Sequence, residues 1–142
     1  MREILFRGKR KDNGEWVYGY YEFYNGGHYI NIQIDRVNSG GYPIREFIEI
    51  DPSTVGQYTG LTANGTKIFE GDIVEGNCHS RWSHRLQRCV VVYDRDSFKS
   101  RHYLNFPNEK HYFEYKVLFS KDVVVIGNIH DNPELLESEV RE

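Results

Sequence analysis

The chain has 142 residues, a length that fits one domain or two small lobes sharing a core. Its net charge of -3 at pH 7 argues against a dedicated nucleic-acid coat, and two cysteines are too few for a disulfide-stabilised scaffold. No stretch approaches the about 20 apolar residues of a membrane span, and the N-terminus lacks the apolar core of a signal peptide, so we expect a cytoplasmic protein without a membrane partner.

Aromatic residues make up 15% of the chain, and this enrichment favours strands because such side chains pack well on a pleated sheet. In the first third of the chain, alternating and aromatic patterns predict strands over residues 3–7, 15–24, 28–34 and 46–50. The turn signal Asn13-Gly14 predicts a hairpin connection between the first two strands. The dipeptide Asp51-Pro52 predicts an interruption after the fourth strand.

Two of these strands predict a sheet with distinct faces, because successive side chains of a strand point to opposite sides. In the aromatic strand, Tyr18, Tyr20 and Tyr24 share one face. In the next strand, the isoleucines face inward and Asn31 faces outward. Tyr-rich strands are good interface material, since Tyr carries a large contact area with a polar tip.

The second part of the chain also predicts strands, here followed by a short helix. The expected strands cover 72–76, 86–94 and 122–129, and a hairpin joins 98–106 to 111–119 across Pro107-Asn108. The C-terminal run NPELLESEV predicts a short helix, in which Asn132 is the cap and Pro133 is the first helical residue.

Three motifs in order, RGKRKDNGEWVYGYY, VGQYTGLTANGTKIFEGDIVE and VIGNIHDNPELLE, resemble those of the YopX family of small phage and prophage proteins. The resemblance spans most of the chain, and the basic segment NCHSRWSHRLQR over residues 77–88 departs from the family pattern. The resemblance implies a β-rich protein with an SH3-type barrel. It also implies an accessory phage product with no assigned reaction, so there are no catalytic residues to carry over.

We therefore expect a mainly β protein with an antiparallel SH3-like barrel, an additional N-terminal β layer and a short C-terminal helix. The expected β layer covers residues 1–54 and the expected barrel covers residues 55–142. The two segments can also form one continuous domain.

The central motif GLTANGTKIFEGDIVE offers a functional and a structural interpretation. In the functional one, Glu70, Asp72 and Glu75 form a carboxylate cluster for a hard cation or for acid–base chemistry. In the structural one, Asn64-Gly65 forms a hairpin turn, Gly71 takes a positive φ, and Asp72 binds nearby backbone N–H groups. We favour the structural interpretation, because a strand period of two scatters the three acids. The sequence thus nominates no catalytic residue, metal site or cofactor.

Cysteine and histidine, the preferred ligands of zinc, cluster at Cys78, His79, His84 and Cys89. Their spacing does not match the usual zinc knuckle, and Cys89 opens the apolar run CVVVY. We therefore expect Cys89 to pack as a small hydrophobic side chain.

The same segment interleaves arginines with a tryptophan, and the candidate binding residues are Arg81, Trp82, Arg85 and Arg88. Arginines can bind phosphate groups, and an exposed indole can stack on a base. With both features, this segment would be a nucleic-acid contact. The alternative is a solvated hairpin tip whose Trp82 packs on the core.

Two classes of function are compatible with the sequence. The favoured hypothesis is a non-enzymatic binding or assembly module of a bacterial host cell, which forms a homo-oligomer and binds a host or phage protein. A nucleic-acid-binding β-barrel is the variant that uses the basic segment. The alternative class is a small metal-dependent hydrolase that uses Glu70, Asp72 and a histidine.

Overall fold

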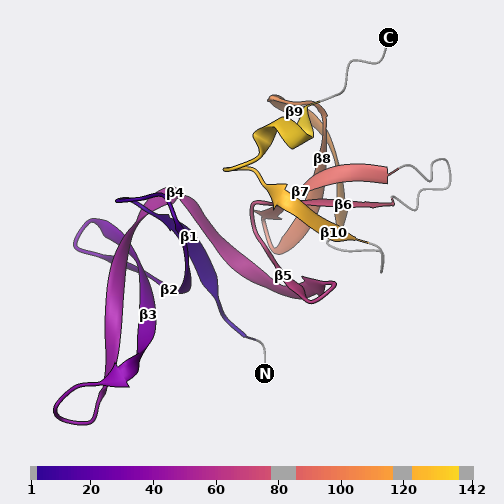
Figure 1. Cartoon of the computed structure of the whole chain (residues 1–142). Coiled ribbons are helices and arrows are strands. Elements are labelled where there is room, and N and C mark those ends of the chain that lie inside the picture. Colours follow the sequence, from indigo (N-terminus) through magenta and orange to yellow (C-terminus); the bar gives the residue numbers. More distant parts are fainter. Residues whose placement is uncertain (1–2, 78–85, 117–122, 138–142) are drawn as a thin grey trace. The chain divides into compact units, whose positions relative to one another are not determined.

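The computed structural model of the chain describes residues 3–77, 86–116 and 123–137. They form two antiparallel sheets and one 3₁₀ turn, and no α-helix occurs within these ranges. The chain divides into two compact units, Met1–Gly60 and Leu61–Glu142, called here the N-terminal and the C-terminal unit (Figure 1). The predicted mainly β class is confirmed.

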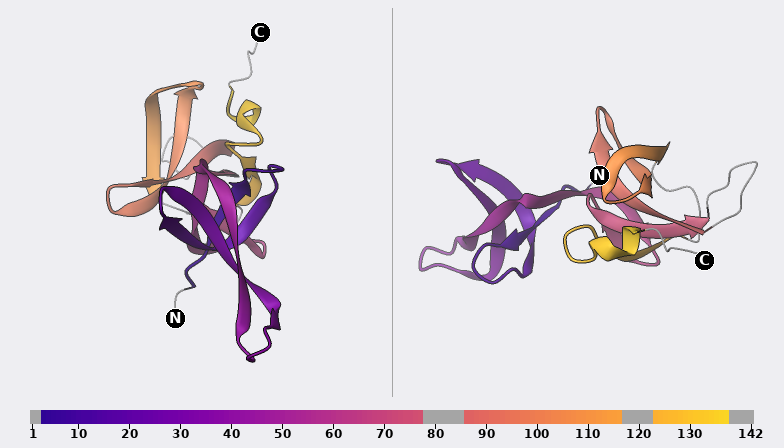
Figure 2. Two further views of the ribbon diagram at one scale, coloured as in Figure 1. Left: turned by 90° about the vertical axis from the view of Figure 1, so that its left-hand side faces the viewer. Right: turned by 90° about the horizontal axis from the view of Figure 1, so that it is seen from above.

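The N-terminal unit is built on β1 (Phe6–Arg10), β2 (Trp16–Tyr24), β3 (Gly27–Val37) and most of β4 (Pro43–Ala63). Each strand pairs antiparallel with the next, and β4 returns to pair with β1, so the pairings of these strands form a closed circuit. The β3–β4 ribbon continues past the end of β2, as Figure 2 shows.

The inner face of this circuit holds the core of the N-terminal unit. Directly paired residues share a face, so the row Tyr21, Ile30 and Ile48 points inward from three neighbouring strands. Ile30 and Ile48 are buried, together with Ile50. Gly8 faces Ile50 from β1, and a Cβ at position 8 would lie 2.7 Å from the Ile50 Cδ1. Glycine at this position therefore lets β1 approach the isoleucine closely.

Strand β4 runs without a break through the predicted interruption at Asp51-Pro52, so that prediction was wrong. The pairing with β1 shifts register here, and Arg7 pairs with Gly56 whereas Lys9 pairs with Asp51. Proline has no backbone N–H, so it is tolerated at such an irregularity, where the strand pairing requires no donor at that position. The predicted boundary between residues 54 and 55 lies inside β4.

Side-chain hydrogen bonds replace the missing ladder bonds at this irregularity. The Lys9 backbone N–H donates to Thr54 Oγ1 at 2.8 Å, and the Thr54 hydroxyl donates to the Asp51 carbonyl at 2.6 Å. The Ser53 backbone N–H donates to Asp51 Oδ1 at 3.0 Å. These bonds satisfy the Lys9 and Ser53 backbone N–H groups and the Asp51 carbonyl where the extended chain passes Pro52.

The C-terminal unit begins with the end of β4, and β5 follows it across the Asn64-Gly65 turn and pairs with it. The further elements are β5 (Thr66–Phe69), β6 (Asp72–Asn77), β7 (Leu86–Asp94), β8 (Ser97–Asn105), β9 (Asn108–Lys116), β10 (Val124–Asn128) and the 3₁₀ turn η1 (Pro133–Leu136). The second sheet has the order β10-β6-β7-β8-β9, with every pair antiparallel. The described pairings run in this linear order, and the SH3-like barrel over residues 55–142 stays a prediction.

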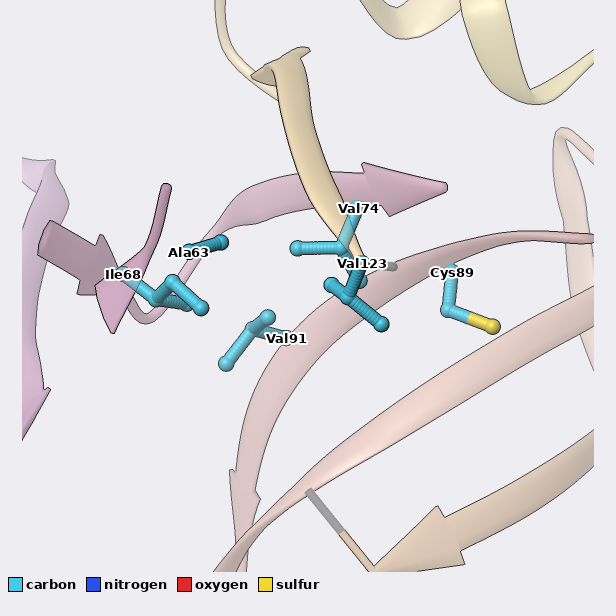
Figure 3. Close-up of a cluster of buried hydrophobic side chains, with 6 residues drawn as sticks. All are labelled: Ala63, Ile68, Val74, Cys89, Val91 and Val123. Atoms are coloured by element: carbon cyan, nitrogen blue, oxygen red, sulfur yellow. The ribbon is translucent and has the colours of Figure 1, made fainter. Parts of the chain in front are cut away.

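Each face of this second sheet carries an apolar cluster. Figure 3 shows the first one, formed by Ala63, Ile68, Val74, Cys89, Val91 and Val123. The second one is formed by Ile73, Val90, Tyr103 and Leu136. Cys89 is buried in the first cluster, which confirms that it packs as a small hydrophobic side chain.

The predicted C-terminal helix is a single 3₁₀ turn, which places Leu136 against the second cluster. Pro133 stands at its start, as predicted. Asn132 does not cap the turn through its side chain; instead Asn132 Oδ1 accepts the Asn128 backbone N–H at 3.3 Å. Within the described ranges no helix has the length and apolar character needed to cross a membrane.

Candidate functional site

The central glycine-rich motif forms turns, as its structural interpretation predicts. Asn64 and Gly65 adopt φ values of 50° and 79° between β4 and β5, and Gly71 adopts 93° before β6. Asp72 is only 2% exposed, and its Oδ2 accepts the Phe69 backbone N–H at 2.8 Å. The buried carboxylate therefore holds the tight turn between β5 and β6.

The three acids of this motif do not converge on one point. Asp72 is buried in its turn, and the Glu75 carboxylate accepts a bond of 2.9 Å from Arg88 Nε on the neighbouring strand. Across the described ranges, no three His, Cys, Asp or Glu side chains are placed to hold a metal ion together. Glu75 and Asp72 thus both have structural roles.

Most of the basic segment lies outside the described residues, including Arg81, Trp82 and Arg85, and so do Cys78, His79 and His84 of the cysteine and histidine cluster. Arg88 is described, and it is exposed on β7. Its guanidinium bonds Glu75 and also donates to the Leu135 carbonyl at 3.1 Å, so it connects the sheet to η1. The nucleic-acid contact stays a prediction.

A second cation on this sheet, Arg101, is neutralised by its neighbours. Its Nη2 lies 3.0 Å from Glu114 Oε1 and 3.5 Å from Asp94 Oδ2, and its guanidinium stacks 4.1 Å from the centre of the Tyr112 ring. Burial lowers the pKa of Arg101, but hydrogen bonds to Glu114 and Tyr103 outweigh it, and the pKa is raised overall. This cluster fixes β8 against its neighbours.

The outer face of the N-terminal unit is unusual because several aromatic side chains remain exposed on it. The register places Tyr20 opposite Asn31 and Asn31 opposite Phe47, and it places Glu22 opposite Tyr29. We define the outer aromatic face by Tyr18, Tyr20, Glu22, Tyr24, Tyr29, Asn31 and Phe47. Tyr20 is 55% exposed, Tyr24 72% and Phe47 54%.

A hollow of about 380 Å³ lies on this face, lined by Glu22, Tyr24, Tyr29 and Phe47. The register explains how three strands combine to build it. Tyr29 is central on β3, with Glu22 directly opposite on β2 and Phe47 one diagonal step away on β4. Three aromatic residues and one glutamate, from three strands, therefore line a single concave site.

Asn31 lies on the outer face, as predicted, but it is buried and only 6% exposed. Its neighbours on either side, Tyr20 and Phe47, explain why solvent reaches it so little. Asn31 Nδ2 donates to Glu22 Oε1 at 3.4 Å. Among the described residues, Asn31 Oδ1 has no hydrogen-bond partner, and a buried acceptor without a partner is costly.

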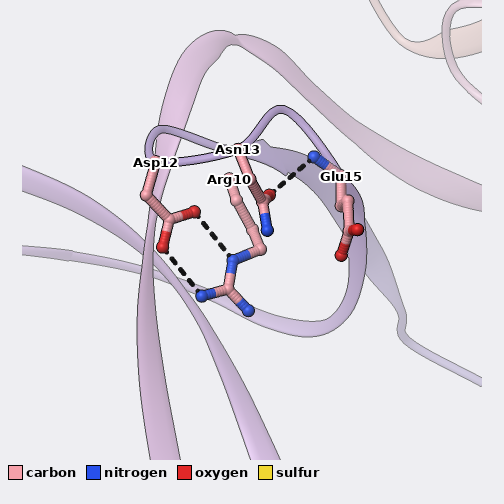
Figure 4. A network of polar contacts seen from close by, with 4 residues as sticks. All are labelled: Arg10, Asp12, Asn13 and Glu15. Carbon is pink, nitrogen blue, oxygen red and sulfur yellow. Dashed lines mark hydrogen bonds and ion pairs between the residues drawn. The ribbon is translucent and has the colours of Figure 1, made fainter.

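A second hollow of about 280 Å³ is lined by Arg10, Lys11, Asp12, Glu46, Phe47, Ile48 and Glu49. Its charges are largely paired within the chain. Arg10 donates two bonds to the Asp12 carboxylate, at 2.9 and 2.8 Å, as Figure 4 shows. The bond with Arg10 lowers the pKa of Asp12 and raises that of Arg10. Asn13 Oδ1 accepts the Glu15 backbone N–H at 2.9 Å and completes the turn.

The YopX protein family matches the chain over residues 5–137. The chain belongs to the YopX family. A crystal structure of protein EF1440 from Enterococcus faecalis is similar to this YopX chain, with a TM-score of 0.56 and 24% sequence identity. The similarity covers 96% of this chain and 100% of that one. At this identity it shows a shared fold and nothing about activity. No curated protein matches the chain significantly.

For this YopX chain, the outer aromatic face is the best-supported candidate site. Sequence alternation predicted that Tyr18, Tyr20 and Tyr24 share a face, and the register confirms it. Sequence reasoning missed the hollow and the unpartnered Asn31 oxygen. The signal available was the alternation of Glu22 and Tyr24 in β2, but the position of Phe47 depends on pairing with β4.

Proposed function

We propose that this YopX-family chain is a non-enzymatic binding or assembly module that docks a host or phage protein through its outer aromatic face. The observation that carries this proposal is the exposure of Tyr20, Tyr24 and Phe47 on one face of one sheet. Exposed aromatic side chains gathered on one surface are typical of protein interfaces, and Tyr is enriched among the residues that dominate binding energy.

Asp72, one of the residues nominated for a hydrolase, has a structural role, which favours binding over catalysis. Asp72 is buried in the turn between β5 and β6, where it accepts a backbone N–H. A buried carboxylate that satisfies a tight turn is poorly placed to bind a substrate or abstract its proton.

The family resemblance supports the remaining parts of the proposal. In this proposal the chain is a phage or prophage accessory protein that acts in the cytoplasm of a bacterial host. Residues 55–142 form an SH3-like barrel in it, flanked by the N-terminal β layer.

The proposal also includes a homo-oligomer formed through the C-terminal unit. Tyr93, Leu104 and Phe113 are exposed on the C-terminal sheet. The register pairs Tyr93 with Phe98 and Phe113 with His102, which puts Tyr93 and Phe113 on one face. Such a face suits contact with a second copy, while the outer aromatic face remains available for another protein.

Copurification of the tagged full chain from bacterial host cells tests the docking proposal. We expect Tyr24→Ser combined with Phe47→Ser to remove a stoichiometric partner band that wild type retains. Tyr42→Ser is the matched control, because Tyr42 belongs to the same unit, is 68% exposed and lies outside the outer aromatic face. Retention of every partner by the double variant, at unchanged stability, would refute the assignment of this face.

A further inference from the structure

We propose that the hollow on the outer aromatic face is a cage for an arginine side chain of the partner protein. This inference rests on the proposed function, because it names the chemistry that the same face recognises. The cage is lined by Tyr24, Tyr29, Phe47 and Glu22.

The aromatic walls provide the first reason for a cationic occupant. The faces of aromatic rings carry negative electrostatic potential and attract a guanidinium or ammonium group placed over them. A guanidinium is planar and weakly hydrated, so it stacks on rings more readily than an ammonium does. Three rings from three strands around one hollow of about 380 Å³ therefore suit the end of an arginine side chain.

The charges around the hollow provide the second reason. Tyr29 is flanked in the register by Glu22 on β2 and Glu49 on β4. Lys11 Nζ lies 3.9 Å from Glu49 Oε2, whereas no lysine or arginine of the described ranges pairs with Glu22. The local charge beside Tyr29 thus favours a cation and disfavours an acidic peptide.

The third reason is the hydrogen bond that Asn31 makes with Glu22. Asn31 Nδ2 donates to Glu22 Oε1 at 3.4 Å, so Glu22 is held by a neighbour on β3 beside the hollow. An arginine offers five N–H donors in a planar fork, which can bond the remaining lone pairs of the Glu22 carboxylate.

A glycine at the tip of the β2–β3 hairpin sets the position of the central ring. A Cβ at Gly27 would lie 2.5 Å from the Tyr29 hydroxyl oxygen and 2.7 Å from its Cε2. Gly27 pairs with Tyr24, so the Tyr29 ring lies over the backbone beside the other tyrosine of the cage. Gly27→Ala would displace the Tyr29 ring without altering any residue that lines the hollow, so Gly27 acts as a positioning residue.

The test is a titration of the isotopically labelled full chain, followed by backbone amide chemical shifts at low salt. Nα-acetyl-arginine amide is the probe, and Nα-acetyl-citrulline amide is its uncharged isostere. We expect the arginine probe to shift the amides of Gly27, Tyr29 and Phe47 in a saturable way and the citrulline probe to shift them far less. Equal shifts with both probes, or no saturable shift with arginine, would overturn the cage. A tighter complex with Nα-acetyl-lysine amide than with arginine would also overturn it.

Variants show whether the binding belongs to this hollow. Glu22→Gln and Tyr24→Ala should each weaken arginine binding about two- to fivefold, as expected for one exposed ion pair or one cation–π contact. Gly27→Ala should weaken it as well. Tyr42→Ala is the matched control, since Tyr42 is exposed in the same unit but lies outside the outer aromatic face, and it should leave affinity unchanged. An equal loss with Tyr42→Ala would place the binding elsewhere on the chain.

The two proposals fail in different experiments. If copurification depends on the outer aromatic face but arginine does not bind the isolated chain, the docking surface stands and the cage is wrong. If the double variant of Tyr24 and Phe47 retains all partners, the docking surface itself is wrong, whatever the probe does.

Discussion

Replacement of Asp72 by alanine should destabilise the C-terminal unit through its turn. Asp72 is 2% exposed and accepts the buried Phe69 backbone N–H at 2.8 Å, so water cannot easily take its place. Loss of the acceptor leaves a buried N–H donor unsatisfied, which costs about 1–3 kcal/mol, so we expect a loss of about 2 kcal/mol. In urea unfolding, with a slope of about 1–3 kcal/mol/M, the midpoint should fall by about 1 M.

Two further variants make this result specific. Asp72→Asn keeps an acceptor oxygen and should recover part of the loss. Glu75→Ala removes a partly exposed ion pair with Arg88, so its cost should stay within about 0.2–1 kcal/mol. An Asp72→Ala protein as stable as wild type would refute the structural role, and a gain in stability would point instead to a strained functional carboxylate.

Three other outcomes follow from the structure. An NMR titration of the Asp12 carboxylate should give a pKa below its ordinary 3.8, because Arg10 bonds the charged form, and Arg10→Ala should return the pKa towards that value. The stability that this pair contributes is present above the ordinary pKa of Asp12 and is lost as pH falls through the lowered pKa. Gly8→Ala should cost about 1–3 kcal/mol in urea unfolding, because its Cβ would lie 2.7 Å from the Ile50 Cδ1. Light scattering should show a concentration-dependent rise in mass that Phe113→Ser reduces, and a monomer at every concentration would contradict self-association.

The local features of this fold could be predicted from sequence because their causes lie within a few residues. Asn64-Gly65 forms a turn since both residues tolerate positive φ, and Asp72 bonds an N–H only three positions away. The faces of β2 follow from the period of two in its own sequence. These features needed no knowledge of which strands pair.

The features that sequence reasoning missed depend on contacts between distant residues. Strand β4 continues past Pro52 because the Lys9 backbone N–H donates to the Thr54 hydroxyl oxygen, 45 positions away in the sequence. Asn31 is buried because Tyr20 and Phe47 flank it from two other strands. The hollow requires the same β3–β4 register, and no local pattern specifies that register.

Site-specific photocrosslinking in host cells most directly tests the claim that the outer aromatic face is the docking surface. A benzophenone amino acid would replace Phe47 on that face or, as the control, Tyr42 in the β3–β4 loop. We predict a single protein adduct from position 47 that weakens when Glu22→Gln is added, and no such adduct from position 42. Adducts of equal yield from both positions, or none from position 47, would contradict the assignment of this face.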